Sequence, residues 1–261
     1  MVYAGCRSTS NSLCSVITVR FNLIDNNIVV GMVVSRSDQN KVHSNDKVAR
    51  VHRDISRDEW VRVHDLSAVD YRNGEWIRES LLGLGKYRKQ MFSNATGRVL
   101  DVACGYGMNF GYLPPDIQLT AIEFSPVMLE MALRHADQLG VKVDIREGDA
   151  EDLPFADNSF DTVISALATC SFTDPVAALM EIRRVCKPEG NILLVEHGRS
   201  QNRLLAWYQD RNADQMIERG GCRWNQQPPE LVKEAGLEIL SDKVSFWGIL
   251  HSIRAIPAKL N

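Results

Sequence analysis

The stretch Val99-Leu-Asp-Val-Ala-Cys-Gly-Tyr-Gly107 joins a run of apolar residues to a turn that holds two glycines. The apolar run predicts a buried strand, and Gly105 and Gly107 let the backbone of the turn approach a ligand closely. The helix that follows such a turn offers free amide donors at its first residues. On these residues alone the turn predicts a ligand-binding loop, with an ordinary strand-to-helix connection as the alternative.

The turn lacks the marks of two common phosphate-binding loops. A dinucleotide fingerprint requires a third glycine three residues after the second, and Phe110 stands at that place. No glycine in the chain is followed by lysine and then by serine or threonine, which excludes a phosphate loop. The loop therefore favours a different ligand.

Short apolar runs alternate with helical stretches on both sides of this loop. Strands are predicted at residues 98–103, 118–124, 141–147, 160–165 and 191–196, and helices at 75–92, 126–139 and 175–186. Farther on, residues 201–218 and 230–235 predict helices, and 237–240 and 244–256 predict two strands that form an antiparallel edge. This alternation predicts an α/β fold: a doubly wound, mostly parallel, seven-stranded Rossmann-like sheet with helices on both faces and an antiparallel edge strand.

Composition separates the first residues from the rest. The 261 residues are 44% hydrophobic and 24% charged with a formal net charge of −3, which excludes disorder throughout and collagen-like architecture. Residues 1–50 carry a net charge of +3, and residues 51–261 a net charge of −6. We expect residues 1–50 to be an N-terminal extension, poorly ordered or used for targeting, and residues 51–261 to be the folded domain. An acidic body also argues against nucleic acid as a partner.

Cysteines and apolar runs bear on the cellular compartment. The six cysteines include no Cys-x-x-Cys pair and no histidine at ligand spacing, so we expect neither disulfides nor a metal site. Free cysteines in apolar runs indicate a reducing, intracellular environment. No run approaches the roughly 18 to 20 apolar residues of a transmembrane helix. Residues 1–24 contain Arg7 and Arg20 but no acid, so we expect a cytoplasmic protein, or a mitochondrial one if they act as a presequence.

Acidic residues follow the second and third predicted strands. Glu123 ends the second strand, 18 residues after Gly105, where a carboxylate can accept hydrogen bonds from both hydroxyls of a ribose. Residues 148–155 follow the third strand, where a carboxylate and backbone groups can bind an exocyclic amine. Each acid alone is more typical of a solvated loop, but their order and spacing together predict a nucleoside site.

Five segments together resemble the successive motifs of class I S-adenosylmethionine-dependent methyltransferases, and the type 11 methyltransferase domain is the nearest group. The segments are residues 101–107, 121–132, 148–155, 158–164 and 181–190. The group includes ubiquinone and menaquinone C-methyltransferases and phospholipid N-methyltransferases. Residues 195–200 and 221–225 resemble a narrower branch of membrane-associated or mitochondrial methyltransferases and thiol methyltransferase-like proteins. The chain departs from the family at Ala103, where glycine is usual, and at residues 188–190, where Pro-Glu-Gly replaces Pro-Gly-Gly.

The resemblance implies a binding site for S-adenosyl-L-methionine, which leaves as S-adenosyl-L-homocysteine. It implies that residues 101–107 hold the methionine part, Glu123 the ribose, and Asp149 and Ala150 the adenine. Phe124 and Met128 would lie beside the ring, although core packing is an equal alternative for Met128. The implied cofactor contacts are Asp101, Ala103, Cys104, Gly105, Gly107, Asn109, Glu123, Phe124, Met128, Asp149, Ala150, Glu151 and Ala166.

Methyl transfer from a sulfonium needs mainly an acceptor held in line with the methyl group. Where the acceptor must also lose a proton, His197 is the candidate catalytic base, because it follows the fifth strand at the end of the sheet that borders the ligand crevice. Glu196 would orient this histidine. The alternative for His197 is a structural hydrogen bond to a neighbouring loop.

The methyl acceptor is predicted only by class. Residues 201–230 should form part of the pocket wall, and with two later residues they supply apolar and aromatic side chains, namely Leu204, Leu205, Trp207, Tyr208, Met216, Trp224, Phe246 and Trp247. These suit a small or lipid-like acceptor (a quinol, a phospholipid amine or a thiol) and peripheral membrane contact, and equally core packing or a helical lid. Two other functions stay open: a non-catalytic S-adenosylmethionine-binding assembly or regulatory protein, and an enzyme that uses the cofactor for chemistry other than methyl transfer.

Overall fold

Two separate units make up the chain, Met1–Val51 and His52–Asn261. The computed structural model describes residues 16–24, 27–35, 62, 63, 65, 66, 79 and 83–258, with the backbone alone for the first two ranges and for Arg219. Within the first unit, β1 (Val16–Ile24) and β2 (Asn27–Ser35) form an antiparallel hairpin. Both segments are rich in β-branched residues, which favour strands. The predicted presequence includes residues 1–15, which lie outside the described residues, and it stays a prediction.

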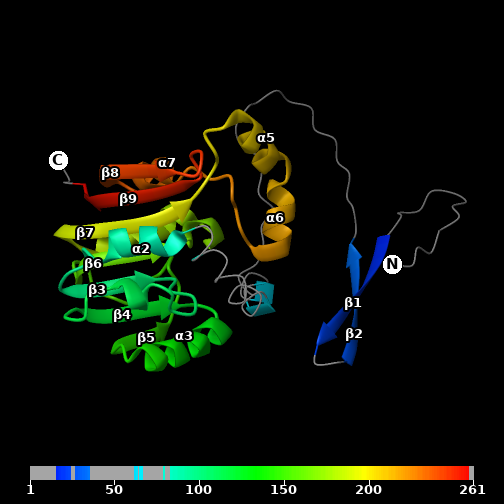
Figure 1. The fold of residues 1–261 in the computed structure, drawn as a ribbon, viewed down its shortest axis with the longest axis horizontal. Coiled ribbons are helices and arrows are strands. Elements are labelled where there is room, and N and C mark those ends of the chain that lie inside the picture. Colours follow the sequence, from blue (N-terminus) through cyan, green and yellow to red (C-terminus); the bar gives the residue numbers. More distant parts are fainter. Residues whose placement is uncertain are drawn as a thin grey trace, which may run out of the picture. The chain divides into compact units, whose positions relative to one another are not determined.

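A seven-stranded sheet organises the second unit, with the strand order β5-β4-β3-β6-β7-β9-β8 (Figure 1). Its strands are β3 (Arg98–Val102), β4 (Gln118–Glu123), β5 (Val143–Glu147), β6 (Phe160–Ala166), β7 (Cys186–His197), β8 (Leu237–Ser245) and β9 (Leu250–Pro257). The first five pair in parallel, whereas β9 is antiparallel to both β7 and β8. The predicted fold class is thus confirmed.

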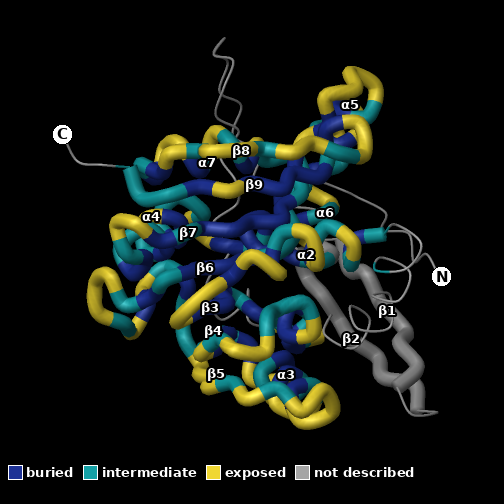
Figure 2. Tube along the Cα trace, turned by 60° about the vertical axis from the view of Figure 1, so that its left-hand side comes forward, coloured by how far each residue is buried: buried dark blue, intermediate teal, exposed yellow. Residues whose placement is uncertain are grey.

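The strand order reverses at β3. From β3 the chain moves outward to β4 and β5, and then returns to the other side of β3 to form β6 and β7. Ligands of open α/β sheets bind at the carboxyl ends of the strands around such a reversal. The central strands are dark blue in Figure 2, which shows that the rest of the unit buries them.

Helix α3 (Pro126–Leu139) has the bounds predicted for it, because capping residues stand at both ends. Ser125 accepts a hydrogen bond from the Met128 amide through its side chain, Pro126 is the first helical residue, and Gly140 ends the helix with a φ of 66°. Helix α4 (Pro175–Val185) begins in the same way, with a proline after the N-cap Asp174. Proline at the first position and glycine after the last are the usual helix boundaries.

Three of the predicted elements are interrupted. Helix α2 (Leu84–Phe92) begins after Gly83, whose left-handed φ of 67° prevents one helix over 75–92. The predicted helix 201–218 is two helices, α5 (Arg203–Arg211) and α6 (Ala213–Gly220), which meet at Asn212. The predicted strand 244–256 is split by three left-handed residues, at 246, 247 and 248.

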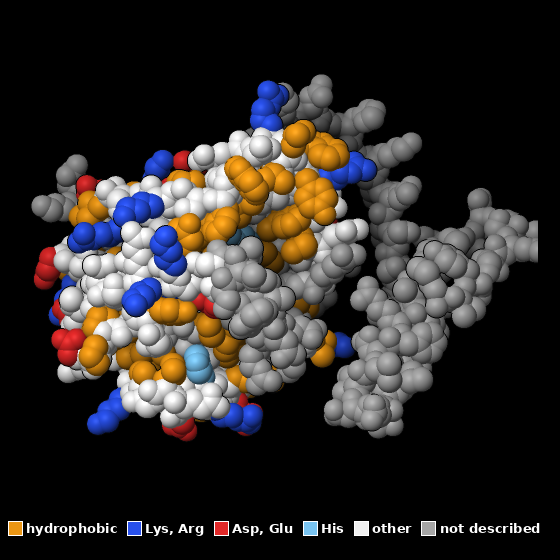
Figure 3. All heavy atoms as spheres, viewed as in Figure 1, with side chains coloured by type: hydrophobic (Ala, Val, Ile, Leu, Met, Phe, Trp, Pro, Cys, Tyr) orange, Lys and Arg blue, Asp and Glu red, His pale blue; other side chains and the backbone are white. Residues whose placement is uncertain are grey.

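Helix α5 presents hydrophobic side chains to solvent. Leu204, Trp207 and Tyr208 are 78%, 60% and 53% exposed, and Trp247 of the β8–β9 turn is 73% exposed. The turn lies against the start of α5, because the Gln201 amide donates a hydrogen bond to the Trp247 carbonyl oxygen. Figure 3 shows hydrophobic side chains gathered on this face over α5 and beside it. None of the described helices is long and apolar enough to cross a membrane.

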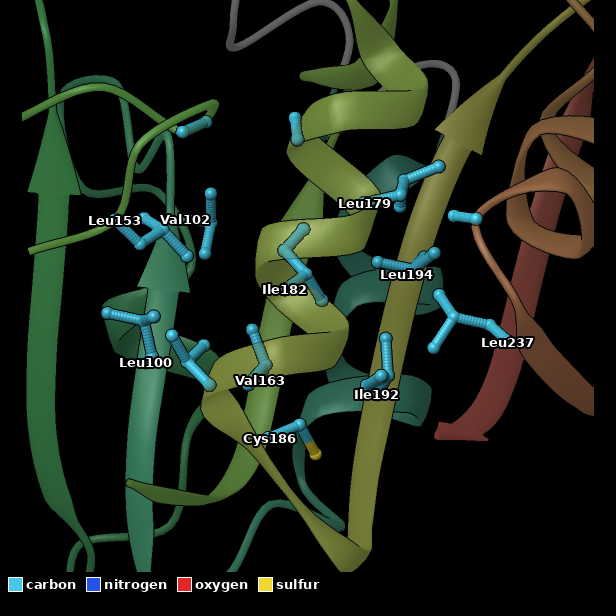
Figure 4. Packing of buried hydrophobic residues seen from close by; sticks show 14 of the residues in the cluster. Leu100, Val102, Leu153, Val163, Leu179, Ile182, Cys186, Ile192, Leu194 and Leu237 are labelled. Atoms are coloured by element: carbon cyan, nitrogen blue, oxygen red, sulfur yellow. The ribbon is translucent and has the colours of Figure 1, made fainter. Parts of the chain in front are cut away.

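Helices cover both faces of the sheet. Along β3, Val99 belongs to a buried cluster with residues of α2 and α3, whereas Leu100 and Val102 belong to a second cluster that includes residues of α4 and of α7 (Pro228–Glu234). Figure 4 shows Leu179 and Ile182 of α4 pointing at the strands on this second face. Side chains alternate between the faces of a strand, so both faces of β3 must be apolar. This core fixes the strand ends that carry the candidate site.

Candidate active site

A cavity lies at the carboxyl ends of the central strands. Its walls include Ala103 after β3, Glu123 at the end of β4, Ala166 at the end of β6 and His197 at the end of β7. It encloses about 880 Å³, counting the space at its open mouth. A second cavity of about 420 Å³ shares Ala103 and Phe124 with the first.

Most of the site residues predicted from the sequence line these two cavities. The larger cavity is lined by Ala103, Cys104, Gly105, Asn109, Glu123, Phe124, Met128, Ala166 and His197. The smaller one is lined by Asp149, Ala150 and Glu151, along with Ala103 and Phe124. Asp101 and Gly107 line neither of them.

The loop after β3 has a left-handed backbone at three positions. Ala103, Gly105 and Gly107 have φ values of 53°, 55° and 85°. A Cβ atom at Gly107 would lie 2.4 Å from Cε2 of Phe110, so glycine is required there for space as well as for conformation. Alanine in the left-handed region costs about 1 kcal/mol, which is the physical reason for the usual glycine at position 103.

Glu123 ties the loop to the end of β4. Its Oε2 accepts a hydrogen bond from the Gly105 amide at 2.9 Å, and its Oε1 accepts bonds from the Phe124 and Ser125 amides at 3.1 and 2.9 Å. Burial raises the pKa of this carboxyl, while the three amide donors act in the opposite direction. A carboxylate has about four acceptor positions, so at least one remains for a ligand hydroxyl.

A buried network of polar side chains supports the loop that follows β3. Nδ2 of Asn109 donates hydrogen bonds to Oδ1 and Oδ2 of Asp101 at 2.9 and 3.1 Å, and Arg88 donates one to Oδ1 of Asn109. Arg88 also donates to Glu79 at 2.7 Å. Burial raises the pKa of Asp101 to about 7, although Asn109 and Arg88 oppose the shift. Asp101 does not line the cavity itself, but it holds the side chain of Asn109, which does.

His197 meets two cysteine side chains at the cavity wall. Its Nε2 lies 3.1 Å from Sγ of Cys170, in η3 (Thr169–Ser171), and 3.4 Å from Sγ of Cys222, which follows α6. The hydrogen bond from Cys222 and the nearby imidazole lower the pKa of the Cys170 thiol. Burial alone would lower the pKa of His197, but the charge of Cys170 raises it.

Residues 100–194 match the family model of the methyltransferase domain. This segment carries the loop, Glu123 and residues 149–151, which are the parts that line both cavities. The chain contains a class I S-adenosylmethionine-dependent methyltransferase domain. The match covers all five motif segments in full, so the resemblance found in the sequence is confirmed.

Several named methyltransferases are similar to this chain. The mitochondrial methyltransferase OMS1 of Saccharomyces cerevisiae is 30% identical over 241 residues, which cover 85% of this chain and 50% of that protein. The phosphatidylethanolamine N-methyltransferase of Cereibacter sphaeroides is 32% identical over 103 residues, covering 39% of this chain and 51% of that enzyme. The demethylmenaquinone methyltransferase of Renibacterium salmoninarum is 32% identical over 157 residues, covering 57% and 63%. The chain thus spans about half to two-thirds of the length of these relatives.

Solved structures share the fold of the methyltransferase domain. A putative methyltransferase from Bacillus halodurans has a TM-score of 0.55 and 20% identity, covering 67% of this chain and 99% of that one. The [4+2]-cyclase SpnF has a TM-score of 0.51 and 28% identity, covering 62% of this chain and 58% of that one. The first of these shows the fold alone, and the second shows that a related chain is a cyclase.

One important residue of the methyltransferase domain was missed in the sequence, and a second has a different role from the one expected. Arg88 was missed, although it lies four residues from both Leu84 and Phe92, and these three are the buried residues of α2. A charged residue on the buried stripe of a helix is the signal that would have identified it. Glu196 was expected to orient His197, but its carboxylate holds the η3 segment instead. It accepts hydrogen bonds from Ser165 Oγ, Ala168 N, Thr169 N and Thr169 Oγ1, and burial raises its pKa to about 7.

The aromatic side chains of residues 201–230 do not form the wall of the larger cavity. This segment reaches the cavity through Gly220 and Cys222, whereas Trp207 and Tyr208 are exposed on α5. Trp224 packs against Tyr208 with ring centroids 5.8 Å apart, and its Nε1 donates a hydrogen bond to the Gln209 carbonyl oxygen. The segment thus forms part of the wall, as expected, but its aromatic side chains do not, because the break at Asn212 separates α5 from the part of the chain that reaches the strand ends.

Proposed function

We propose that this methyltransferase domain transfers a methyl group from S-adenosyl-L-methionine to a small or lipid-like acceptor. The observation that carries the proposal is the pair of adjoining cavities at the strand reversal, lined by residues of the methyltransferase motifs. The larger cavity would receive the methionine part and the ribose. The smaller one would receive the adenine beside Asp149, Ala150 and Glu151.

The residues present fit this cofactor. Glu123 keeps acceptor capacity for a ribose hydroxyl after its three backbone bonds. The Asp149 side chain holds the turn beside the smaller cavity, because its Oδ1 accepts a hydrogen bond from the Glu151 amide at 2.9 Å. The left-handed loop brings residues 103–106 to the surface of the larger cavity, and Gly105 has no Cβ atom there. These features support binding of a nucleoside joined to an amino acid.

When bound, the cofactor supplies a methyl group on a positively charged sulfur, which leaves as a neutral thioether. The chain's own contribution is to position the acceptor in line with that methyl group and to exclude water. Ala166 and His197, at the ends of β6 and β7, would border the acceptor on the side away from Glu123. The use of His197 as a base stays a prediction, for acceptors that must lose a proton.

Exposed hydrophobic residues support a lipid-like acceptor such as a phospholipid amine or a quinol. Leu204, Trp207, Tyr208 and Trp247 form one surface on α5 and the β8–β9 turn, here named the α5 patch. Aromatic side chains with a polar edge suit the interface of a membrane. Two relatives carry names of enzymes for phosphatidylethanolamine and demethylmenaquinone, which agrees with this class. The yeast relative's name likewise supports a mitochondrial location for this chain.

A labelling experiment tests the proposal. The chain is incubated with methyl-labelled S-adenosyl-L-methionine and, in separate reactions, with phosphatidylethanolamine vesicles, a demethylated quinol, small thiols and small amines. Label is expected in one acceptor with the native chain and to fall in the Glu123→Ala variant, while Glu147→Ala serves as the matched control. Glu147 is the exposed residue that pairs with Glu123 at the end of the neighbouring strand.

The outcomes separate the proposal from two other functions. Consumption of the cofactor without label in any acceptor would indicate an enzyme that uses the cofactor for chemistry other than methyl transfer. Cofactor binding without consumption would indicate a non-catalytic assembly or regulatory protein. Either result overturns methyl transfer as the function.

A further inference from the structure

We propose that Cys170, His197 and Cys222 form a binding site for a soft divalent metal ion, with Zn²⁺ preferred. The three side chains come from the η3 segment, the end of β7 and the loop after α6. Sγ of Cys170, Nε2 of His197 and Sγ of Cys222 all lie within 4.8 Å of one another. Residue spacing does not predict such a site, because Cys170 and His197 are 27 positions apart in the sequence and His197 and Cys222 are 25 positions apart.

The two sulfur–nitrogen distances are close to those of a tetrahedral site, and the two sulfur atoms lie within 4.8 Å of each other. With Zn–S bonds of about 2.3 Å and Zn–N bonds of about 2.0 to 2.1 Å, tetrahedral angles place sulfur and nitrogen about 3.6 Å apart. The two sulfur–nitrogen distances in this structure are 3.1 and 3.4 Å. Entry of the ion therefore requires the donor atoms to separate by only a few tenths of an ångström, which side-chain rotation can provide.

The protein backbone holds this arrangement without an ion. The Arg223 amide donates a hydrogen bond to the Cys170 carbonyl oxygen at 2.9 Å, which fixes the residue after Cys222 beside Cys170. His197 is the last residue of β7 and is paired with Leu250 in the sheet. Glu196 holds the amides of Ala168 and Thr169, and so fixes the η3 segment. A preformed donor set lowers the cost of ordering on binding.

The chemistry of the donors selects the metal. Thiolate and imidazole are the ligands of Zn²⁺ and related soft ions, and two thiolates balance the charge of a divalent cation. Glu196 does not supply a fourth ligand, because its two oxygens already accept bonds from Ser165, Ala168 and Thr169. Across residues 83–258, no further cysteine, histidine or acid belongs to the cluster. Three protein ligands with an open position are typical of catalytic zinc sites.

The open position would face the cavity proposed to bind the cofactor, since all three residues line it together with Gly105 and Glu123. This consequence rests on the proposed function. A thiol acceptor bound at that position would lose its proton to solvent and present a thiolate to the cavity. His197 would then be a metal ligand through Nε2, and it could not also accept the acceptor's proton there.

Metal binding is tested on the full chain without cofactor or acceptor. Competition with a chromogenic chelator should show one Zn²⁺ per chain. Co²⁺ should give sulfur-to-metal charge-transfer bands and the strong visible bands of a tetrahedral site. Cys222→Ser and His197→Gln should each lower the Zn²⁺ affinity by on the order of 100-fold. Cys186→Ser and His135→Gln are the matched controls and should bind as the native chain does, because neither residue lines the cavity.

Three results would overturn the metal site. These are equal Zn²⁺ affinity in the native chain and both site variants, Co²⁺ spectra without sulfur bands, and a Cys170–Cys222 disulfide in protein purified under reducing conditions. Circular dichroism checks that each variant is folded, and a folded variant with native Zn²⁺ affinity counts against the site. Failure of methyl transfer would leave the Zn²⁺ titration unchanged, so the two proposals fail separately.

Discussion

Replacing Glu123 with alanine should weaken both the cofactor site and the fold. The substitution removes the acceptor for the Gly105, Phe124 and Ser125 amides, at 2.9, 3.1 and 2.9 Å. Hydrogen bonds to a charged group contribute about 1.5 to 3 kcal/mol each, but the cost of burying the carboxylate offsets much of their sum. We expect the free energy of unfolding to fall by about 2 to 4 kcal/mol.

Cofactor affinity should fall by about 1 to 3 kcal/mol, roughly 5- to 150-fold, if Glu123 accepts a bond from a ribose hydroxyl. Isothermal titration calorimetry with S-adenosyl-L-homocysteine measures the affinity, at a temperature where denaturant unfolding shows the variant to be folded. Glu147→Ala, at the exposed end of the neighbouring strand, should leave both quantities near their native values. Native affinity in a folded Glu123→Ala variant would refute the ribose assignment.

Three other perturbations follow from the geometry of the second unit. Burial raises the pKa of Asp101 from 3.8 to about 7. The folded state therefore binds this proton more tightly than the unfolded state does. The stability that results is fully present below about pH 4 and is lost as the pH rises through about 7. Between about pH 5 and 8 the loss is roughly 2 to 3 kcal/mol, and denaturant unfolding should show a smaller pH dependence in Asp101→Asn than in the native chain. Gly107→Ala should lower the free energy of unfolding by at least about 2 kcal/mol, because its Cβ would lie 2.4 Å from the Phe110 ring at a φ of 85°; an unchanged denaturation midpoint would contradict this. Trp207→Ser together with Trp247→Ser should reduce cosedimentation with phospholipid vesicles several-fold at unchanged stability, and equal cosedimentation would show that the α5 patch does not contact lipid.

The elements that the sequence predicts best are those whose boundaries are local. Helix α3 is predicted to its last residue, because Ser125, Pro126 and Gly140 specify its ends. The breaks at Gly83 and Asn212 were missed, since the apolar periodicity continues across both positions. A left-handed glycine or a shared cap interrupts the hydrogen bonding of a helix without altering its hydrophobic pattern. Periodicity therefore locates the buried faces of helices more reliably than their ends.

In the candidate site, too, the residues that the sequence predicts are those that lie close together along the chain. The loop and Glu123 are predicted because a strand, two glycines and an acid at a fixed distance form a pattern along one short segment. Arg88 reaches the same site from α2, through Asn109, which lies 21 residues away in the sequence. The cluster of Cys170, His197 and Cys222 depends on the order of strands in the sheet, which residue spacing does not encode. Local spacing alone therefore led to the expectation of no metal site.

The end of β7 shows how two adjacent residues place a third that is distant in sequence. Glu196 accepts hydrogen bonds from the amides of Ala168 and Thr169. Nε2 of His197 contacts Sγ of Cys170, which directly follows Thr169 in the sequence. The position of the Cys170 thiol in the cavity is thus set by β7, because the amides of Ala168 and Thr169 donate hydrogen bonds to Glu196 of that strand. A buried carboxylate with four donors tolerates little displacement. Shortening Glu196 to aspartate should therefore move Cys170 away from His197, even though neither the thiol nor the imidazole is altered.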